Sequence, residues 1–148
     1  MTADTSPAPC PFCDIMAGRL PSSQVHADDD VVAFMDIRPA NVGHLLVVPR
    51  VHKAGLEALD EQLGAKVFAV AHRLSRALRA SGVRCDGVNM LLADGAAAGQ
   101  EVFHVHMHVL PRFAGDGFGL NVRWLSPDRA ELDAAAALIR ASLDRLPM

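Results

Sequence analysis

The stretch Phe103-His104-Val105-His106-Met107-His108-Val109-Leu110-Pro111 carries a histidine at every second position of a hydrophobic run. Successive side chains of a β-strand point to opposite faces, so this spacing predicts a strand over residues 103–110 with all three imidazoles on one face. A solvated strand face usually carries Lys, Thr, Glu and Ser instead. Because imidazole can be a nucleophile, a general base, a cation or a metal ligand near neutral pH, the row predicts a functional site.

The composition predicts a single domain. The chain has 148 residues, of which 51% are hydrophobic, which is enough for one hydrophobic core and too few for two.

Charge and hydropathy limit the partners that we expect. The net charge is −3 with Lys and Arg scattered singly, so we expect no nucleic-acid partner. No run of about 18 apolar residues and no signal-peptide pattern are present, which predicts a cytoplasmic protein without membrane contact.

Periodicity and turn residues divide the chain. Residues 1–9, rich in Pro, Ala, Ser and Thr, predict a flexible leader before an ordered domain over residues 10–148. Short apolar runs predict further strands at residues 31–36, 44–48 and 88–92. Helical spacing predicts a short helix at 13–18, a long helix at 60–81 followed by Gly82 at C′, and a tail helix at about 127–146 capped by Ser126. We therefore expect an α+β fold.

The pair Cys10-Pro-Phe-Cys13 is the second chemical signal. Three cysteines do not make a disulfide framework, which agrees with a reducing compartment. A thioredoxin-like redox pair would follow a core strand, and none is predicted before Cys10. With histidines abundant, a Cys₂His₂ zinc site is favoured over a redox or incidental pair, and His104 is one candidate nitrogen donor.

The residues around the histidine row suit phosphoryl chemistry. Gly99 and Gln100 precede the row, so backbone N–H groups there can meet an anion that the imidazoles also face. A neutral histidine can attack phosphorus while a neighbouring histidine protonates or hydrogen-bonds the departing oxygen. His106 is the natural nucleophile, because both neighbouring histidines reach its substrate.

Three further residues stay ambiguous from position alone. His44 and His52 are either loop-edge histidines or functional groups. Asp36 either caps the Pro turn that follows it or accepts a ribose hydroxyl.

The run His104-Val105-His106-Met107-His108-Val109-Leu110 resembles the His-x-His-x-His-x-x motif, with apolar x, of the histidine triad (HIT) superfamily of nucleotide hydrolases and transferases. The resemblance covers roughly residues 10–125, and the Cys-Pro-Phe-Cys start is most similar to the bacterial Hit branch, related to Hint and more distantly to Fhit. It implies the HIT fold, a five-stranded antiparallel sheet with one long and one or two shorter helices. It also implies a homodimer, joined through the long helix and a central strand.

The resemblance implies a hydrolase or nucleotidyl transferase that cleaves phosphoramidate or phosphoanhydride bonds at the α-phosphate of purine nucleotides, releasing AMP. His106 would form a nucleotidyl-histidine, and His44 and His108 would bind the phosphate. Asp36 would hold the ribose hydroxyls, and Ile37 would line the nucleoside pocket. The alternatives are a diadenosine polyphosphate hydrolase, a nucleotide-binding regulatory protein with little catalysis, and, from the residues alone, a zinc-dependent hydrolase.

Relatives that begin with such a cysteine pair hold structural zinc through it. The implied ligands are Cys10, Cys13, His52 and His104. Four protein ligands leave no open position for a zinc-activated water. No organic cofactor is implied.

The chain departs from its relatives at two positions. Glu101 stands where Hint-like proteins carry a Ser or Thr that contacts the phosphate, and a carboxylate there repels a phosphate unless it turns away or is protonated. Ala93 replaces an Asn or Gln, and Asn89 on the same strand face is a candidate substitute. The predicted substrate-binding residues are therefore Asp36, Ile37, Asn89, Gly99, Gln100 and Glu101.

Overall fold

The computed structural model describes residues 9–147, so the leader predicted for residues 1–9 lies almost entirely outside the described residues. The chain divides into two compact units, the first ending at Phe118 and the second beginning at Gly119. The elements of the first unit are α1 (Pro11–Met16), β1 (Gln24–Ala27), β2 (Val31–Met35), β3 (Leu45–Pro49), α2 (Glu61–Ala80), β4 (Gly87–Leu91) and β5 (Met107–Arg112). Short 3₁₀ turns lie at Leu56–Ala58 and Ala96–Ala98. The second unit contains α3 (Arg129–Leu143).

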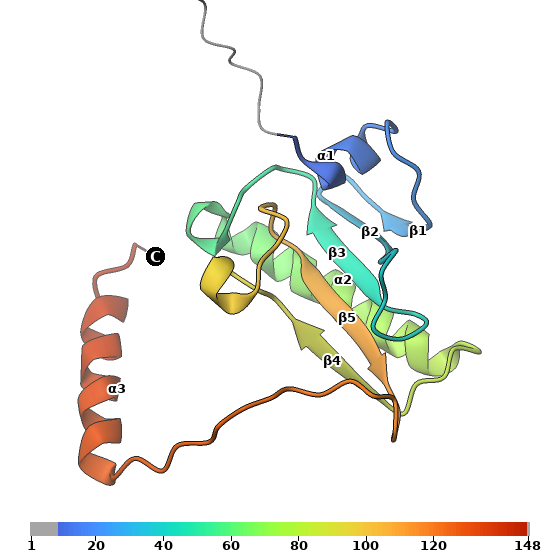
Figure 1. Ribbon diagram of the computed structural model, residues 1–148. Coiled ribbons are helices and arrows are strands. Elements are labelled where there is room, and N and C mark those ends of the chain that lie inside the picture. The colour runs from blue at the N-terminus through green and yellow to red at the C-terminus, as the bar shows by residue number, and fades with distance from the viewer. Residues whose placement is uncertain (1–8, 148) are drawn as a thin grey trace, which may run out of the picture. The chain divides into compact units, whose positions relative to one another are not determined.

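The strands form one antiparallel sheet in the order β1-β2-β3-β5-β4 (Figure 1). This confirms the predicted α+β fold with a five-stranded antiparallel sheet. In the centre of the sheet His108 pairs with Leu46 of β3 on one side and with Leu91 of β4 on the other. The register therefore fixes His108 on a strand that is paired along both edges.

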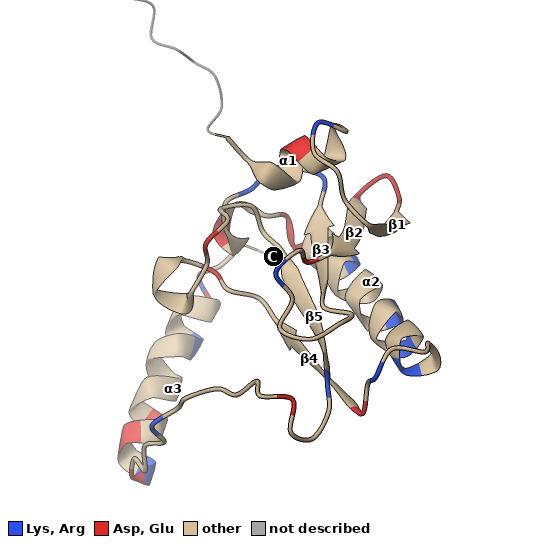
Figure 2. Ribbon diagram, turned by 45° about the vertical axis from the view of Figure 1, so that its right-hand side comes forward, with Lys and Arg blue, Asp and Glu red and all other residues tan. Residues whose placement is uncertain are grey.

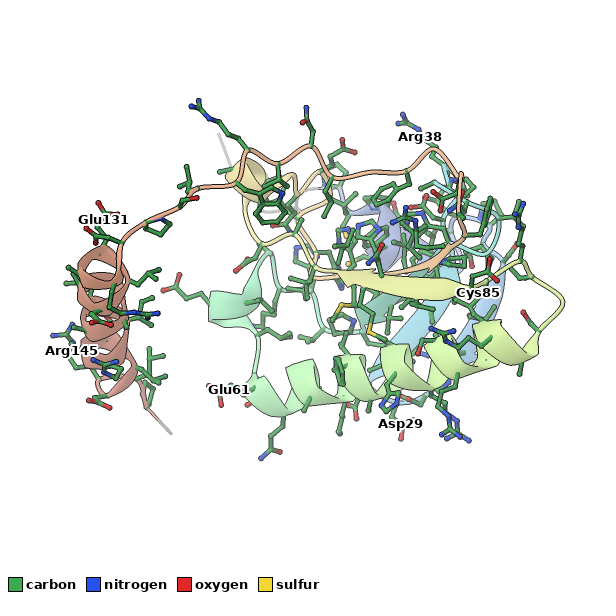
Figure 3. The ribbon with its side chains drawn as sticks, turned by 90° about the horizontal axis from the view of Figure 1, so that it is seen from below. Asp29, Arg38, Glu61, Cys85, Glu131 and Arg145 are labelled. Carbon is green, nitrogen blue, oxygen red and sulfur yellow. The ribbon has the colours of Figure 1, made fainter. Side chains whose placement is uncertain are left out.

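One face of the sheet packs on α2, which runs across it (Figure 3). The helix begins at Glu61, one residue after the predicted start, because Asp60 is its N-cap and the Asp60 side chain accepts the backbone N–H of Gln62 at 2.9 Å. Val67, Ala71 and Leu78 of the predicted apolar stripe are buried against the sheet. The helix ends at Ala80 with Ser81 as its extended C-cap, so Gly82 stands at C′ as predicted, but it does not adopt the left-handed conformation typical of that position.

The other face of the sheet packs on α1. Cys10 caps this helix with its sulfur, which accepts the N–H of Cys13 at 3.4 Å, and Pro11 occupies the first turn. The helix thus begins two residues before the predicted start. Phe12 is buried against Phe34 of β2, with ring centroids 5.5 Å apart. This face carries the second core of the unit.

The strand predicted over residues 103–110 is shorter than expected. β5 begins at Met107, and only His108 of the three histidines lies on it. The preceding residues leave the sheet because the N–H of Val105 donates to the carbonyl of Lys53 at 2.8 Å. The prediction of a single strand face for all three imidazoles is therefore wrong.

The second unit contains the tail helix at Arg129–Leu143, inside the predicted range of about 127–146. Its cap is Asp128 and not Ser126, because the Asp128 side chain accepts the N–H of Glu131 at 2.8 Å.

Basic residues gather along α2, and acidic residues lie mostly in loops and at helix starts (Figure 2). None of the helices within residues 9–147 is long and apolar enough to cross a membrane.

Candidate active site and metal centre

A cavity of about 660 Å³ opens on the α1 side of the sheet. This volume lies in the range of small-molecule sites. Its apolar wall includes Phe12, Ile15, Leu20, Phe34 and Leu46, and its polar wall includes Asp36, Arg38, Glu101, His106 and His108. Arg38 stands on the side of the sheet away from α2 (Figure 3). The cavity thus joins an apolar compartment to a row of polar and charged groups.

His106 is 6% exposed and lines this cavity. Its Nδ1 lies 2.7 Å from the backbone carbonyl oxygen of His104. A carbonyl oxygen only accepts hydrogen bonds, so Nδ1 carries a proton and Nε2 is the nitrogen that can hold the lone pair. The edge of the Phe12 ring packs against the imidazole, with centroids 5.0 Å apart and planes at 78°. His106 is therefore a ring of fixed orientation whose Nε2 is the nitrogen left for attack, as a nucleophile requires.

His44 and His108 form a short proton chain. The backbone N–H of Ala40 donates to Nδ1 of His44 at 3.1 Å, so the proton of neutral His44 is on Nε2. Nε2 lies 2.9 Å from Nδ1 of His108 and donates to it, which leaves the proton of His108 on its own Nε2. Burial, with smaller contributions from the neighbouring histidines, lowers the pKa of His108 to about 4. Burial also lowers the pKa of His44. Both rings are thus neutral at pH 7, and His108 contributes a hydrogen-bond donor to the cavity wall.

Asp36 follows β2 and lines the cavity, as does Ile37, which is 90% exposed. One carboxylate oxygen of Asp36 caps the turn by accepting the N–H of Arg38 at 2.8 Å. The other lies 3.6 Å from Nε2 of His44. The capping and the functional interpretations of Asp36 are therefore compatible, because only one oxygen is used by the turn.

Donor atoms of Asp36, His44 and His108 lie within 4.8 Å of one another, a spacing that suits a metal ion. The hydrogen bond from Ala40 argues against this use. It requires a lone pair on Nδ1 of His44, so Nε2 is protonated and is not free to ligate. The trio is better suited to hydrogen bonding with an anion or a hydroxyl.

The second cluster comprises Cys10, Cys13, His52 and His104, with one donor atom from each within 4.8 Å of the others. The sulfur-to-nitrogen distances are 3.4 Å (Cys10 to His104), 3.4 Å (Cys13 to His52) and 3.6 Å (Cys13 to His104), and the two Nδ1 atoms are 3.1 Å apart. Tetrahedral zinc with Zn–N of about 2.0 Å and Zn–S of about 2.3 Å gives edges of about 3.3–3.8 Å. The donor set and its spacing therefore fit a zinc ion.

The protonation of His104 also fits a metal ligand. Its Nε2 lies 2.7 Å from the carbonyl oxygen of Pro49, and therefore donates to it. This leaves the lone pair on Nδ1, the nitrogen that faces the two cysteines. The fully buried His104 thus points its free nitrogen into the cluster while its backbone carbonyl holds His106.

The remaining predicted substrate-binding residues lie in different places. Gly99, at a φ of +89°, and Glu101 line the cavity. Gln100 is buried, and its side chain is used by its own loop: it accepts from Gly95 N–H and donates to the carbonyls of Ala54 and Val102. Asn89 on β4 accepts from Arg112 Nη1 at 2.6 Å and is not in the cavity wall.

Three residues next to the site were not singled out from the sequence. They are Asn41, Arg112 and Asp116: the side chains of Asn41 and Arg112 both donate hydrogen bonds to the Asp116 carboxylate at the end of β5. The spacing of Arg112 and Asp116, four residues apart, was the available signal. The Gly-Asp-Gly context of Asp116 instead predicted an irregular segment.

The sequence profile of the HIT domain matches residues 17–115. The chain belongs to the HIT family. An uncharacterised HIT-like protein of Borreliella burgdorferi is 48% identical over 111 residues, which are 74% of this chain and 80% of that protein.

Solved structures share the fold. A zinc-bound histidine triad family protein from Mycobacterium smegmatis has a TM-score of 0.72 at 39% identity, over 90% of this chain and 96% of that one. A histidine triad nucleotide-binding protein from Candida albicans has a TM-score of 0.83 at 26% identity, over 94% of this chain and 100% of that one.

Proposed function

We propose that this protein hydrolyses purine nucleoside phosphoramidates or related nucleotidyl conjugates at the α-phosphorus and releases a nucleoside monophosphate, AMP foremost. The observation that carries the proposal is the pair of opposite hydrogen-bond arrangements in one cavity: His106 donates from Nδ1 to a carbonyl, which directs Nε2 to the substrate, whereas His108 accepts at Nδ1 and carries its proton on Nε2. Family membership and the nucleotide-binding protein of Candida albicans support a nucleotide as the ligand.

The proposed reaction has two displacements. Nε2 of His106 attacks the α-phosphorus, a P–N bond to histidine forms, and the bond to the leaving amine breaks as that amine takes up a proton from solvent water. A water molecule then attacks the phosphorus and gives up a proton to solvent, the histidine–phosphorus bond breaks, and the nucleoside monophosphate leaves. Nε2–H of His108 hydrogen-bonds to the phosphoryl oxygens in both steps and stabilises the charge that develops there. His44 acts with His108 by donating to its Nδ1.

The other wall residues would position the nucleotide. The free oxygen of Asp36 would accept the ribose hydroxyls, and Ile37 with the apolar wall would enclose the base. Backbone N–H groups of the loop around Gly99 would meet the phosphate. The side chains of Gln100 and Asn89 are already hydrogen-bonded to other protein groups, Gln100 to Ala54 and Asn89 to Arg112. We therefore propose that both act on the substrate indirectly, Gln100 through the shape of its loop and Asn89 through Arg112.

The charges of the cavity favour an amine as the leaving group. Among the described residues, its wall carries the carboxylates of Asp36 and Glu101 and the guanidinium of Arg38. His108 adds no positive charge at pH 7, because burial lowers its pKa to about 4. A polyphosphate leaving group would meet more negative than positive charge and be repelled. Diadenosine polyphosphates are therefore expected to be poorer substrates than phosphoramidates.

We propose that Cys10, Cys13, His52 and His104 hold a structural zinc ion. The ion would supply a cross-link between α1, the loop after β3 and the segment before β5, with no open position for water activation. Cys10 and Cys13 flank Phe12, whose ring packs on His106. The metal centre would thereby hold the hydrophobic support of the nucleophile in place.

The wider assignments are also proposals. Residues 10–148 would act as one HIT domain in the cytoplasm.

We also propose a homodimer that forms through α2, on whose surface the side chain of Phe68 is 52% exposed. Sedimentation equilibrium of the wild type and of Phe68→Glu tests it: a dimer that the substitution dissociates supports the proposal, and a monomeric wild type contradicts it.

The test of the function is the release of AMP from adenosine 5′-phosphoramidate. His106→Ala is expected to abolish it, while His72→Ala, the same change at an exposed position of α2, is expected to leave it unchanged. Full turnover by His106→Ala would refute the mechanism. A wild type that binds AMP in calorimetry but turns over neither phosphoramidates nor dinucleotides would instead identify a regulatory nucleotide-binding protein.

A further inference from the structure

A buried carboxylate at the end of β5 lies outside the cavity wall. The side chain of Asp116 is 3% exposed. It accepts hydrogen bonds from Arg112 Nε at 2.6 Å and Nη2 at 3.0 Å, and from the backbone N–H groups of Phe113 at 3.2 Å and Phe118 at 3.1 Å. The Arg112 guanidinium holds the pKa of this carboxyl well below its usual range. The group is thus permanently charged and serves as a fixed acceptor.

Asn41 connects this carboxylate to the loop between β2 and β3. Its Nδ2 donates to Asp116 Oδ2 and to the carbonyl of Pro111, both at 2.9 Å. The carbonyl of Asn41 accepts the N–H of His44 at 3.1 Å. One side-chain amide therefore ties the loop that carries Asp36 and His44 to the end of the strand that carries His108.

The same loop decides which nitrogen of His44 carries the proton. The N–H of Ala40, next to Asn41, donates to Nδ1 of His44 at 3.1 Å. If this N–H moved away, both neutral tautomers of His44 would be populated. In the tautomer with Nδ1 protonated, His44 no longer donates to His108, and the proton of His108 is no longer held on Nε2. The donor that faces the cavity would be lost in part of the molecules.

We propose that Asp116 is a positioning residue of the nucleotide site: through Asn41 it holds the N–H of Ala40 on His44 and so fixes the proton of His108 on Nε2. The expected effect of Asp116 on catalysis rests on the proposed function. Its expected effect on the tautomer of His44 is independent of that function. A role limited to stability would leave the tautomers unchanged, which separates the two possibilities.

The experiment compares the full-length wild type with Asp116→Asn by the ¹⁵N shifts of the imidazole nitrogens in long-range ¹H–¹⁵N spectra at pH 7. The wild type is expected to show His44 and His108 protonated on Nε2 alone. In the variant both rings are expected to show averaged shifts. The kcat for adenosine 5′-phosphoramidate is expected to fall about tenfold or more, with KM changed about twofold or less.

Asn41→Ala breaks the same link while leaving the Asp116–Arg112 pair in place. It is expected to give the same averaged shifts, and it serves as the test if Asp116→Asn fails to fold. The double variant is expected to lose no more kcat than the more impaired single variant, because both act through one connection. Arg84→Ala is the matched control, since Arg84 packs over the neighbouring Phe113 ring at 3.9 Å. It should leave the tautomers unchanged.

Unchanged tautomers in both Asp116→Asn and Asn41→Ala would overturn the inference, as would additive losses of kcat in the double variant. A wild type with the expected tautomers but no turnover of any nucleotide would refute the proposed function alone. In that case the averaged shifts in the variants would still support the role of Asp116.

Discussion

The backbone carbonyl oxygen of His104 lies 2.7 Å from Nδ1 of His106. The side chain of His104 meanwhile directs Nδ1 at Cys10 and Cys13 and donates from Nε2 to Pro49. One residue thus connects the proposed metal centre to the ring orientation of His106, the proposed nucleophile. This relationship explains how a structural ion would affect chemistry that it does not perform.

Removal of zinc should therefore lower stability first and activity second. We expect Cys13→Ser to lose the ion and to lower the melting temperature by about 10 °C or more. Metal analysis, thermal unfolding and AMP release on the same samples provide the measurement. Immediate and fully reversible inactivation by a chelator, with unchanged thermal unfolding, would favour a metalloenzyme instead.

Phe12 should matter to both stability and rate. It is 6% exposed and contacts the rings of Phe34 and His106. Phe12→Ala is expected to cost about 3 kcal/mol of unfolding free energy from the cavity that it creates. Phe12→Leu should cost less, yet both should lower kcat more than they raise KM, because the His106 ring loses its lateral contact. A change in KM alone would contradict this role.

Glu101 should discriminate between leaving groups. Glu101→Gln is expected to raise kcat/KM for diadenosine polyphosphates by about tenfold, because it removes one like charge. The kcat/KM for the phosphoramidate should change about twofold or less. Glu57→Gln, an exposed residue outside the cavity wall, is the control. Equal changes for both substrates would show that Glu101 does not select by charge.

His108 should make stability depend on pH. The unfolded histidine binds a proton below about pH 6.5, whereas burial delays protonation of the folded one to about pH 4. The unfolded state therefore binds more protons in this window, and stability falls as the pH is lowered from about 6.5 to about 4, by about 3 kcal/mol at most. Denaturant unfolding of the wild type and His108→Gln at several pH values measures it. The difference between the two should shift across this window, and a constant difference would refute the buried, neutral state of His108.

The sequence predicted the elements whose signals are local. The helical spacing of apolar residues located α2, because this spacing depends on neighbouring residues. The short runs around Val31 and Leu45 located β2 and β3. The limits of β5 were wrong because alternation continues through His104 and His106, while the contact between Val105 and Lys53 takes the backbone off the sheet.

The site was predicted in its members and less well in its connections. The residues alone predicted Cys10, Cys13 and His104 as metal ligands, the resemblance added His52, and the structure brings the donor atoms of all four together. The contact of Asn41 with Asp116 spans 75 residues and has no sequence signal. The tautomer of His44 depends on the backbone N–H of Ala40, which side-chain patterns do not report.

The most direct measurement of the central claim is the trapping of the covalent intermediate. Wild-type protein mixed with adenosine 5′-phosphoramidate and quenched in alkali during turnover should carry one adenylyl group, mapped by peptide fragmentation to His106. An adduct on any other residue would contradict the claim. So would the absence of any adduct in samples that are turning over, if one diastereomer of adenosine 5′-phosphoramidothioate hydrolysed in ¹⁸O-labelled water gives a phosphorothioate with the inverted configuration of one direct displacement.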